Sequence, residues 1–382
     1  MTAVDPAALV VGVPRETKPG EHRVAITPDG VHELRAHGAP VLVEHDAGAD
    51  SALTDADYRA AGAEIAKDAA DVWARAGLVL KVKEPQPNEF EHLRAGLVVF
   101  TYLHLAAYPD VADALLARGV TAVGYETVQT ESRALPLLAP MSEIAGRMAP
   151  QVGAHFLERD AGGRGVLLGG APGVRPARVV VLGAGNVGGN AAWIAQGMEA
   201  EVILLDRNLD RLRTVDQIHR GRILTLASNR GAIERAVPEA DLLVGAVLVP
   251  GGRAPVLVTE DMVRSMKRGA VIVDIAVDQG GCIATTRETT HAEPVFELHG
   301  VLHYAVGNMP GAVPHSSTYA LTNATLPYAV ALATHGVARA TLSDPALAAG
   351  VNTAAGRVTN AAVAAALGRA PFGLEDALAA TA

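Results

Sequence analysis

The sequence predicts an α/β protein made of two doubly wound, parallel-sheet (Rossmann-like) domains separated by a cleft. Short apolar runs alternate with helical stretches through the first 125 residues, and a G-x-G-x-x-G motif then follows a further apolar run at residues 179–182. A second alternating series comes after that motif. Alternation at this spacing is typical of right-handed βαβ crossovers, which give parallel sheets covered by helices on both faces.

The first series contains five expected strands and five expected helices. The strands are Leu9–Val13, Val41–Glu44, Leu78–Val82, Leu97–Tyr102 and Thr121–Tyr125. The helices are Asp29–His37, Asp55–Ala61, Ala70–Ala76, Asn88–Arg94 and Pro109–Arg118. After a proline-rich connection at 134–139, the pattern predicts a long helix over Met141–Arg159.

The glycine motif predicts a dinucleotide site. Gly183 allows a tight turn, Gly185 lets the backbone approach a pyrophosphate, and Gly188 lets the following helix pack closely on its strand. The next apolar run, Val202–Leu205, ends on Asp206, whose carboxylate can bind ribose hydroxyls and would repel a 2′-phosphate. We therefore expect NAD rather than NADP, although Arg207 beside it is a residue that can contact a phosphate. The alternative is an ordinary βα turn without a cofactor.

The position of this motif predicts the domain organisation. Further strands are expected at Asp241–Val247, Ala270–Ile275 and Val301–Val306, and from Ser317 onward the pattern is helical with an alanine-rich tail. Because the motif lies in mid-chain, we expect an inserted NAD-binding domain of residues 140–308. The substrate domain would then be discontinuous, formed by residues 1–139 plus 309–382.

Composition excludes several other classes of protein. The net charge of −9 argues against nucleic-acid binding, which needs a basic surface. The N-terminus lacks a signal pattern, and no run reaches the roughly 20 apolar residues of a membrane helix. Cys282 is the single cysteine, which rules out an internal disulfide and a cysteine-based metal cluster. We expect a cytoplasmic protein that needs no metal and no membrane partner.

Basic residues follow the ends of the expected strands in the first domain. Of the 32 basic residues only five are lysines, and two of these are Lys81 and Lys83. Arg23 follows the first strand, Lys83 the third and His104 the fourth, so all three can meet at the carboxyl edge of the sheet. A guanidinium pairs with a carboxylate, an ammonium polarises a carbonyl and an imidazole transfers protons. This set suits a 2-oxo acid and its 2-amino or 2-hydroxy counterpart.

Each of these residues also has a plainer interpretation. Arg23 can form a surface salt bridge with Glu21 or Asp29, the lysines can be solvated, and His104 can be structural. On the nucleotide domain, Asp278 and Asn308 follow expected strands and face the cofactor in one interpretation, whereas in the other they only stabilise turns.

The chain resembles the alanine dehydrogenases almost from end to end. The resemblance is carried by Arg15-Glu-Thr-Lys, Arg23-Val-Ala-Ile-Thr-Pro, Lys81-Val-Lys-Glu-Pro, Thr101-Tyr-Leu-His104-Leu-Ala, Tyr125-Glu-Thr-Val, Ala139-Pro-Met-Ser142-Glu, the glycine motif, Asp274-Ile-Ala-Val-Asp278-Gln-Gly-Gly, Asn308-Met-Pro-Gly and Ala320-Leu-Thr-Asn-Ala-Thr-Leu-Pro-Tyr328. It implies reversible, NAD-dependent oxidative deamination of L-alanine to pyruvate and ammonia in a homohexamer. The chain departs from the family pattern at Gly307 and at His315-Ser316, close to the expected cofactor-side loop.

The resemblance also implies roles for individual residues. Arg23 would hold the substrate carboxylate, Lys83 would contact the carbonyl or amino group, His104 would be the acid/base, and Asp278 would assist at the imine and carbinolamine stage. The implied cofactor contacts are Ser142, Gly183, Gly185, Asn186, Val187, Gly188, Asp206, Val247, Leu248, Ile275, Asp278, Val306, Asn308 and Met309. Two alternatives remain: an NAD(H)-binding module of a proton-translocating transhydrogenase, and a non-catalytic NAD(H)-binding protein.

Overall fold

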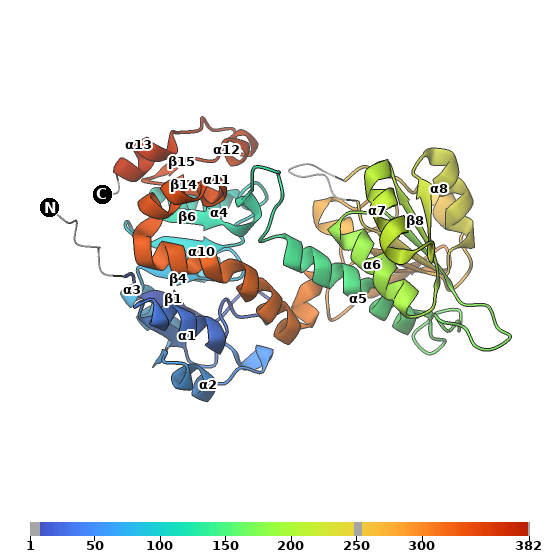
Figure 1. Ribbon diagram of the computed structural model, residues 1–382, viewed down its shortest axis with the longest axis horizontal. Helices are drawn as coiled ribbons and strands as arrows, with labels where there is room; N and C mark the ends of the chain where they lie inside the picture. Colours follow the sequence, from blue (N-terminus) through green and yellow to red (C-terminus); the bar gives the residue numbers. More distant parts are fainter. Residues whose placement is uncertain (1–7, 248–253, 381–382) are drawn as a thin grey trace. The chain divides into compact units, whose positions relative to one another are not determined.

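The computed structural model describes residues 8–247 and 254–380. The chain forms two compact units (Figure 1). Unit 1 consists of the residues up to Met141 together with those from Gly311 onward, and unit 2 consists of Ser142–Pro310. Each unit has its own sheet flanked by helices, which confirms the predicted α/β class with two doubly wound domains.

The sheet of unit 1 has eight strands in the order β15-β14-β6-β5-β4-β1-β2-β3. Its strands are β1 (Val11–Val13), β2 (Val41–Glu44), β3 (Glu64–Ala66), β4 (Leu78–Leu80), β5 (Val98–Thr101), β6 (Thr121–Gly124), β14 (Val351–Ala354) and β15 (Arg357–Val358). The first six are parallel, and the β14–β15 hairpin joins β6 in the antiparallel sense. The strand order reverses direction between β1 and β4, and ligands bind at such a switch point in open α/β sheets.

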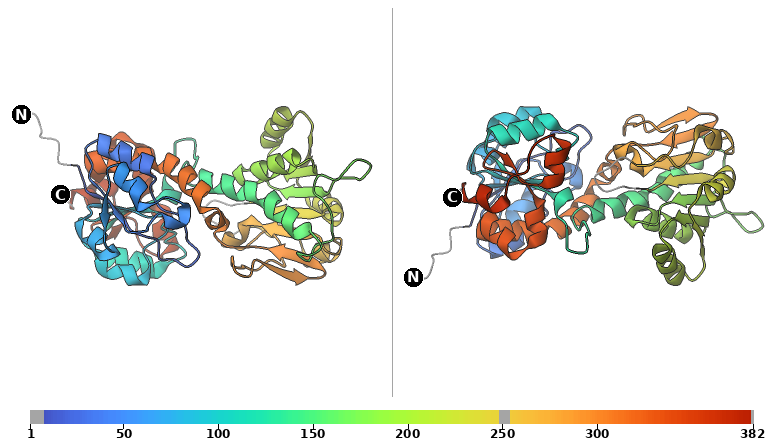
Figure 2. Two further views of the ribbon diagram at one scale, coloured as in Figure 1. Left: turned by 90° about the horizontal axis from the view of Figure 1, so that it is seen from below. Right: turned by 90° about the horizontal axis from the view of Figure 1, so that it is seen from above.

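Helices cover this sheet, and the long helix near the C-terminus packs against the first helix of the chain. They are α1 (Pro28–Ala36), α2 (Asp55–Ala60), α3 (Ala69–Arg75), α4 (Pro109–Ala117), α10 (Pro314–Ser343), α11 (Pro345–Gly350), α12 (Ala361–Ala366) and α13 (Leu374–Ala379), with 3₁₀ turns η1 (Ala49–Ser51), η2 (Pro87–His92) and η3 (Tyr125–Thr127). The orange α10 lies against the blue α1 in Figures 1 and 2, although nearly 300 residues separate them. Gly336, with φ +69°, bends α10.

The sheet of unit 2 has seven strands in the order β12-β13-β11-β10-β7-β8-β9. They are β7 (Arg178–Leu182), β8 (Glu201–Asp206), β9 (Ile223–Ala227), β10 (Leu242–Gly245), β11 (Val271–Asp274), β12 (Val295–Leu298) and β13 (Val301–Tyr304), all parallel except β12. The helices are α5 (Ala139–Leu157), α6 (Asn186–Gly197), α7 (Leu209–His219), α8 (Arg230–Ala236) and α9 (Glu260–Arg264), with 3₁₀ turns η4 (Val237–Glu239), η5 (Ile275–Gln279) and η6 (Met309–Ala312). Here the strand order reverses between β7 and β10.

Buried apolar strands explain both sheets. All residues of β1, β4, β5 and β6, and of β10, β11 and β13, are buried, as expected for parallel strands covered on both faces. The caps also follow the sequence: Thr27 accepts a hydrogen bond from the Gly30 N–H at the start of α1, and Pro28 occupies its first turn.

The structure corrects the sequence-based expectation in three respects. Asn88–Arg94, predicted as a helix, lies largely in the 3₁₀ turn η2, which begins at Pro87. The strands β3, β9 and β12 were not predicted. The tail after Ser317, predicted as helical, contains the hairpin β14–β15, because Val351 to Ala354 are fully buried against β6. Among the described residues, no helix is both long and apolar enough to cross a membrane.

Candidate active site

Three loops of unit 1 carry the predicted substrate residues. Arg23 lies in the loop after β1, Lys83 in the turn after β4, and His104 directly after β5. These strands are neighbours in the parallel sheet, so their carboxyl ends share one edge, at the switch point. Burial lowers the pKa of both His104 and Lys83. The charges of Lys83, Lys18 and Arg23 lower the pKa of His104 further, and the charge of Arg23 does the same for Lys83. The structure therefore brings the three residues together.

Arg23 forms a buried ion pair, not the surface salt bridge considered as its plainer interpretation. Its Nε donates to Glu21 Oε1 at 2.6 Å, and its terminal nitrogen contacts Glu21 Oε2. The side chains of Arg23 and Glu21 are 2% and 0% exposed. Burial opposes ionisation of Glu21, but the Arg23 charge and hydrogen bonds outweigh it and lower the pKa of Glu21 to about 2. The other terminal nitrogen of Arg23 lies 2.7 Å from Met141 Sδ.

Lys83 is a cation held in an unfavourable environment. Burial, followed by the charge of Arg23, lowers the pKa of its ammonium. Its carbonyl oxygen accepts a hydrogen bond from Thr101 Oγ1 at 2.9 Å, which fixes the backbone. An incoming carboxylate or carbonyl would relieve this excess of positive charge.

His104 is held by its backbone, and its ring makes no hydrogen bond to the described residues. Glu126 Oε1 accepts the His104 N–H at 2.6 Å, and the same carboxylate accepts the Leu103 N–H at 3.2 Å. These bonds support the left-handed conformation of His104, with φ +47°. The ring stacks on Tyr102, with centroids 5.7 Å apart. Burial and the neighbouring cations lower the pKa of His104 to about 3, so the imidazole is neutral near pH 7. It is a weak proton acceptor in this state, and a substrate carboxylate that offset the neighbouring cations would raise its pKa.

A cavity of about 500 Å³ opens beside Arg23 in unit 1. It is lined by residues of the loop after β1, including Arg15, Lys18 and Glu21, and by Asp46 and Asp50. Lys18 pairs with Glu84 and lies 4.5 Å above the Tyr108 ring.

A small polar group near this cavity has metal-ligand chemistry. His45 Nδ1 lies 2.6 Å from Asp55 Oδ2, and Asp46 lies beside them. The carboxylates of Asp46 and Asp55 both contact the ring nitrogens of His45.

Lys81 and Lys83, which sequence reasoning grouped together, have different environments in the structure. Lys81 is completely buried, with its Nζ 2.9 Å from Glu89 Oε1 and 3.1 Å from Glu16 Oε2. Burial raises the pKa of Glu16 to about 7, against the opposing charge of Lys81. Sequence reasoning missed Glu16, Glu89 and Glu126, and it named Glu21 only as a possible surface partner of Arg23. The signal for Glu126 was its position after a buried strand.

The glycine motif of unit 2 has the geometry of a phosphate cradle. Gly183 follows β7 with φ +101°, and a Cβ there would lie 2.6 Å from the Ala246 oxygen. A Cβ on Gly188 would lie 1.8 Å from the Gly183 oxygen, so only glycine allows α6 to pack this closely. A Cβ on Gly185 would meet only the end of Arg211, at 3.8 Å, which leaves room over the first turn of α6. Asn186 and Val187 begin that turn, and Gly185 caps it without a side-chain hydrogen bond.

Asp206 ends β8 and faces the same turn. Its Oδ2 accepts the Ala184 N–H at 2.6 Å, and its Oδ1 accepts the Asn208 N–H at 2.7 Å. Arg211 lies 3.8 Å from this carboxylate. The Asp206 carboxylate is therefore fixed beside the glycine motif.

The other predicted cofactor contacts occupy the loops that follow neighbouring strands of unit 2. Val247 follows β10, Ile275 begins η5 after β11, and Val306, Asn308 and Met309 follow β13, whereas Ser142 lies in α5. Asn308 has φ +57°, and its carbonyl oxygen lies 3.3 Å from His291 Nε2. The backbone of Asp278 lies in η5, but its side chain and the whole of Leu248 lie outside the described residues.

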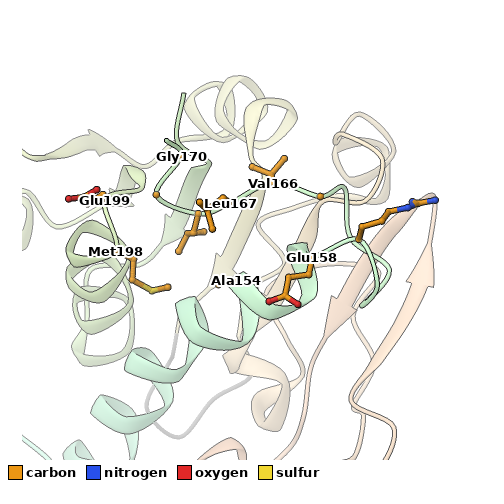
Figure 3. Close-up of a pocket in the computed structure, with 11 residues that line it drawn as sticks. Ala154, Glu158, Val166, Leu167, Gly170, Met198 and Glu199 are labelled. Carbon is orange, nitrogen blue, oxygen red and sulfur yellow. The ribbon is translucent and has the colours of Figure 1, made fainter. Parts of the chain in front are cut away.

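A hollow of about 590 Å³ in unit 2 was not predicted (Figure 3). It is lined by the end of α5 near Ala154 and Glu158, by the segment 165–170, and by Met198 and Glu199. These residues precede β7 and β8, so the hollow lies at the edge of the sheet opposite the glycine motif.

Comparisons with known proteins agree along nearly the whole chain. The models for the alanine dehydrogenase/PNT N-terminal and C-terminal domains match residues 12–145 and 149–361. The alanine dehydrogenase of Bacillus subtilis is 55% identical over 371 residues, covering 97% of this chain and 98% of the relative. That of Mycobacterium tuberculosis (H37Rv) is 56% identical over 362 residues, covering 95% and 97%.

Solved structures give the same result. An L-alanine dehydrogenase superposes with a TM-score of 0.92 at 50% identity, covering 94% of this chain and 99% of the other. A transhydrogenase from Sinorhizobium meliloti gives 0.79 at 26% identity, covering 92% and 99%. The chain is thus more similar to these alanine dehydrogenases than to that transhydrogenase, and it belongs to the alanine dehydrogenase/PNT family.

Proposed function

We propose that this protein catalyses the reversible oxidative deamination of L-alanine to pyruvate and ammonia, with NAD as the hydride acceptor. The observation that carries the proposal is the grouping of Arg23, Lys83 and His104 beyond three adjacent parallel strands, with mutually interacting charges. The names of the relatives and the family membership support the same activity.

The substrate side of the reaction follows from the side chains of unit 1. Arg23 pairs with the substrate carboxylate, which would share or replace the contacts that its guanidinium now makes with Glu21 and Met141. After the hydride leaves the substrate Cα, water adds to the resulting iminium carbon. His104 removes a proton from that water, and the carbinolamine then loses ammonia to give pyruvate. Lys83 stabilises the negative charge that develops on the oxygen. We assign Asp278 a supporting role at the imine and carbinolamine stage.

The residues of unit 2 fit NAD, which supplies the hydride-accepting C4 of its nicotinamide. The first turn of α6 offers backbone N–H groups to the pyrophosphate, in the space left over Gly185. Asp206 would accept hydrogen bonds from the adenosine ribose hydroxyls. Val247, Ile275, Val306, Asn308 and Met309 follow strands at the same sheet edge, on which we expect the remainder of the cofactor to lie.

We further propose that the protein is a cytoplasmic homohexamer, as the resemblance implies. Light scattering coupled to gel filtration tests the assembly, with six chains of 39.4 kDa as the expected mass.

One spectrophotometric assay tests the activity. NADH formation is measured with L-alanine and, for comparison, with glycine, serine and lysine. Turnover with L-alanine supports the proposal. Hydride exchange between NAD(H) and NADP(H) without amino-acid turnover would instead identify a transhydrogenase module, and NADH binding without any turnover would identify a non-catalytic protein.

The variant His104→Ala tests the proposed acid/base. We expect kcat to fall by roughly 10²- to 10⁴-fold, the range associated with a lost general base. NADH binding should be nearly unchanged, because the proposed cofactor contacts lie in unit 2. Near-normal turnover would remove His104 from the mechanism.

A further inference from the structure

The buried carboxylate of Glu16 connects loops that carry the proposed substrate residues. Its Oε1 accepts the backbone N–H of Val82 at 2.6 Å, and its Oε2 lies 3.1 Å from Lys81 Nζ. Glu16 belongs to the loop after β1 that leads to Arg23, whereas Val82 directly precedes Lys83. The side chain of Glu16 is 2% exposed.

Val82 is a junction between three strand ends. Its N–H is bound by Glu16, and its carbonyl oxygen accepts the Tyr102 N–H at 3.3 Å. Tyr102 is two residues before His104 and stacks on its ring. The strand β4 ends at Leu80, and beyond it the Lys81 N–H still donates to the Phe100 oxygen at 3.2 Å. The Glu16 carboxylate adds a bond to the Val82 N–H and so ties this turn to the loop after β1.

We infer that Glu16 is a positioning residue, which fixes the Val82 peptide so that Lys83 stands at its place in the substrate site. This inference rests on the proposed function, since it assigns Glu16 a part in the alanine reaction. Glu16 itself acts through Val82 and Lys83 rather than by contact with substrate. A displacement of about 1 Å in a substrate-positioning group can cost around 100-fold in rate.

Glu89 provides a matched control for Glu16. Both carboxylates pair with Lys81, at 2.9 Å for Glu89 and 3.1 Å for Glu16, and both are almost fully buried. The second oxygen of Glu89, however, accepts the N–H of Gln86 within η2 and does not contact Val82. Loss of either carboxylate leaves Lys81 with one partner, whereas only loss of Glu16 releases the turn before Lys83.

The experiment compares Glu16→Ala, Glu89→Ala and Glu16→Gln as full-length proteins. We measure kcat/KM for pyruvate at saturating NADH and ammonia, the KM for NADH, and the melting temperature. Glu16→Ala should lower kcat/KM for pyruvate by about 10- to 100-fold. Glu89→Ala should stay within about threefold of wild type at a similar loss of melting temperature. Glu16→Gln, whose amide oxygen can still accept the Val82 N–H, should recover most of the loss. The KM for NADH should not change in any variant.

Equal losses for Glu16→Ala and Glu89→Ala would overturn the inference, because the role of Glu16 would then be only to stabilise Lys81. Full activity of Glu16→Ala would overturn it as well. Wild-type protein that turns over neither alanine nor pyruvate would overturn the proposed function, and with it this inference. If one of the variants does not fold, Glu16→Ala and Glu89→Ala are compared again in a Lys81→Met background, in which the buried ammonium is absent. The same outcomes then support or overturn the inference.

Discussion

The tight packing of Gly188 gives a prediction that tests the nucleotide site without reference to the substrate. In Gly188→Ala, the new Cβ would lie 1.8 Å from the carbonyl oxygen of Gly183. Carbon and carbonyl oxygen approach to roughly 3.3 Å at closest, so the start of α6 must move away from the turn after β7 by roughly 1.5 Å. Neither contacting atom belongs to a flexible side-chain end, because both are fixed by the backbone of the motif.

The cost of this displacement sets the expected loss of NADH affinity. Overpacking of a close contact costs about 1–3 kcal/mol, and each 1.4 kcal/mol is about tenfold in an equilibrium constant. When NADH binds to the variant, the N–H groups of α6 must be brought back into line with the pyrophosphate, and this requires energy because it restores the close contact. We therefore expect the NADH dissociation constant to rise by about 5- to 150-fold.

Gly189 supplies the control, because a Cβ at this neighbouring position meets no atom within 4 Å. Gly189→Ala should bind NADH as wild type does and should melt slightly higher, since alanine favours a helix over glycine by up to about 1 kcal/mol. Titration of NADH fluorescence measures both dissociation constants. A Gly188→Ala variant that binds within twofold of wild type, or equal weakening in both variants, would refute the reasoning.

Three further predictions concern charge. Lys83→Arg keeps the charge but replaces a compact ammonium by a planar group, and NADH formation from L-alanine should fall by at least about 100-fold, whereas retained activity would show that the reaction does not need the compact ammonium. Asp206→Ser removes a carboxylate that would repel a 2′-phosphate, and the ratio of kcat/KM for NADP over NAD should rise about tenfold; an unchanged ratio would contradict the assignment of Asp206 to the ribose. Burial and neighbouring cations lower the pKa of His104 from 6.5 in the unfolded chain to about 3 in the folded protein. Between these two pH values the imidazole is protonated in the unfolded chain but not in the folded protein. The free energy of unfolding therefore falls as the pH falls from 6.5 towards 3. Denaturant unfolding of His104→Gln should therefore lose less stability than wild type between pH 6.5 and 4, and parallel losses would exclude His104 as the source.

The sequence predicted the sheets and the positions of the site residues for one physical reason. Parallel strands covered on both faces appear as continuous apolar runs, and their carboxyl ends share an edge. Residues that follow Val13, Leu80 and Thr101 therefore lie near one another even without knowledge of any contact.

The separate roles of Lys81 and Lys83 were beyond such reasoning. Two residues apart in a continuing strand would share a face, but the strand ends at Leu80 and the following turn sends Lys81 into the interior. The partners of Lys81 are Glu16 and Glu89, which lie 65 positions before it and 8 after it, and no local pattern identifies such a cluster.

The C-terminal hairpin escaped prediction for a related reason. The strand β14 is only four residues long and contains the buried polar residues Asn352 and Thr353, so it shows no apolar run. Its identity as a strand comes from partners far away in sequence: Thr353 Oγ1 donates to the Val120 oxygen at 3.0 Å. Secondary structure that depends on an edge formed more than 200 residues earlier is not encoded locally.

The β14–β15 hairpin affects the order in which the two units can fold during synthesis. In the part of the chain that the structure describes, β14 is the strand that covers the edge of β6, so the sheet of unit 1 stays incomplete on that side until residues 351–358 have been synthesised. Unit 2 is contiguous, from Ser142 to Pro310, and all its strands are available before then. During translation the inserted domain can therefore finish folding first, while the earlier strands of unit 1 wait with an open β6 edge that is a template for pairing with other chains.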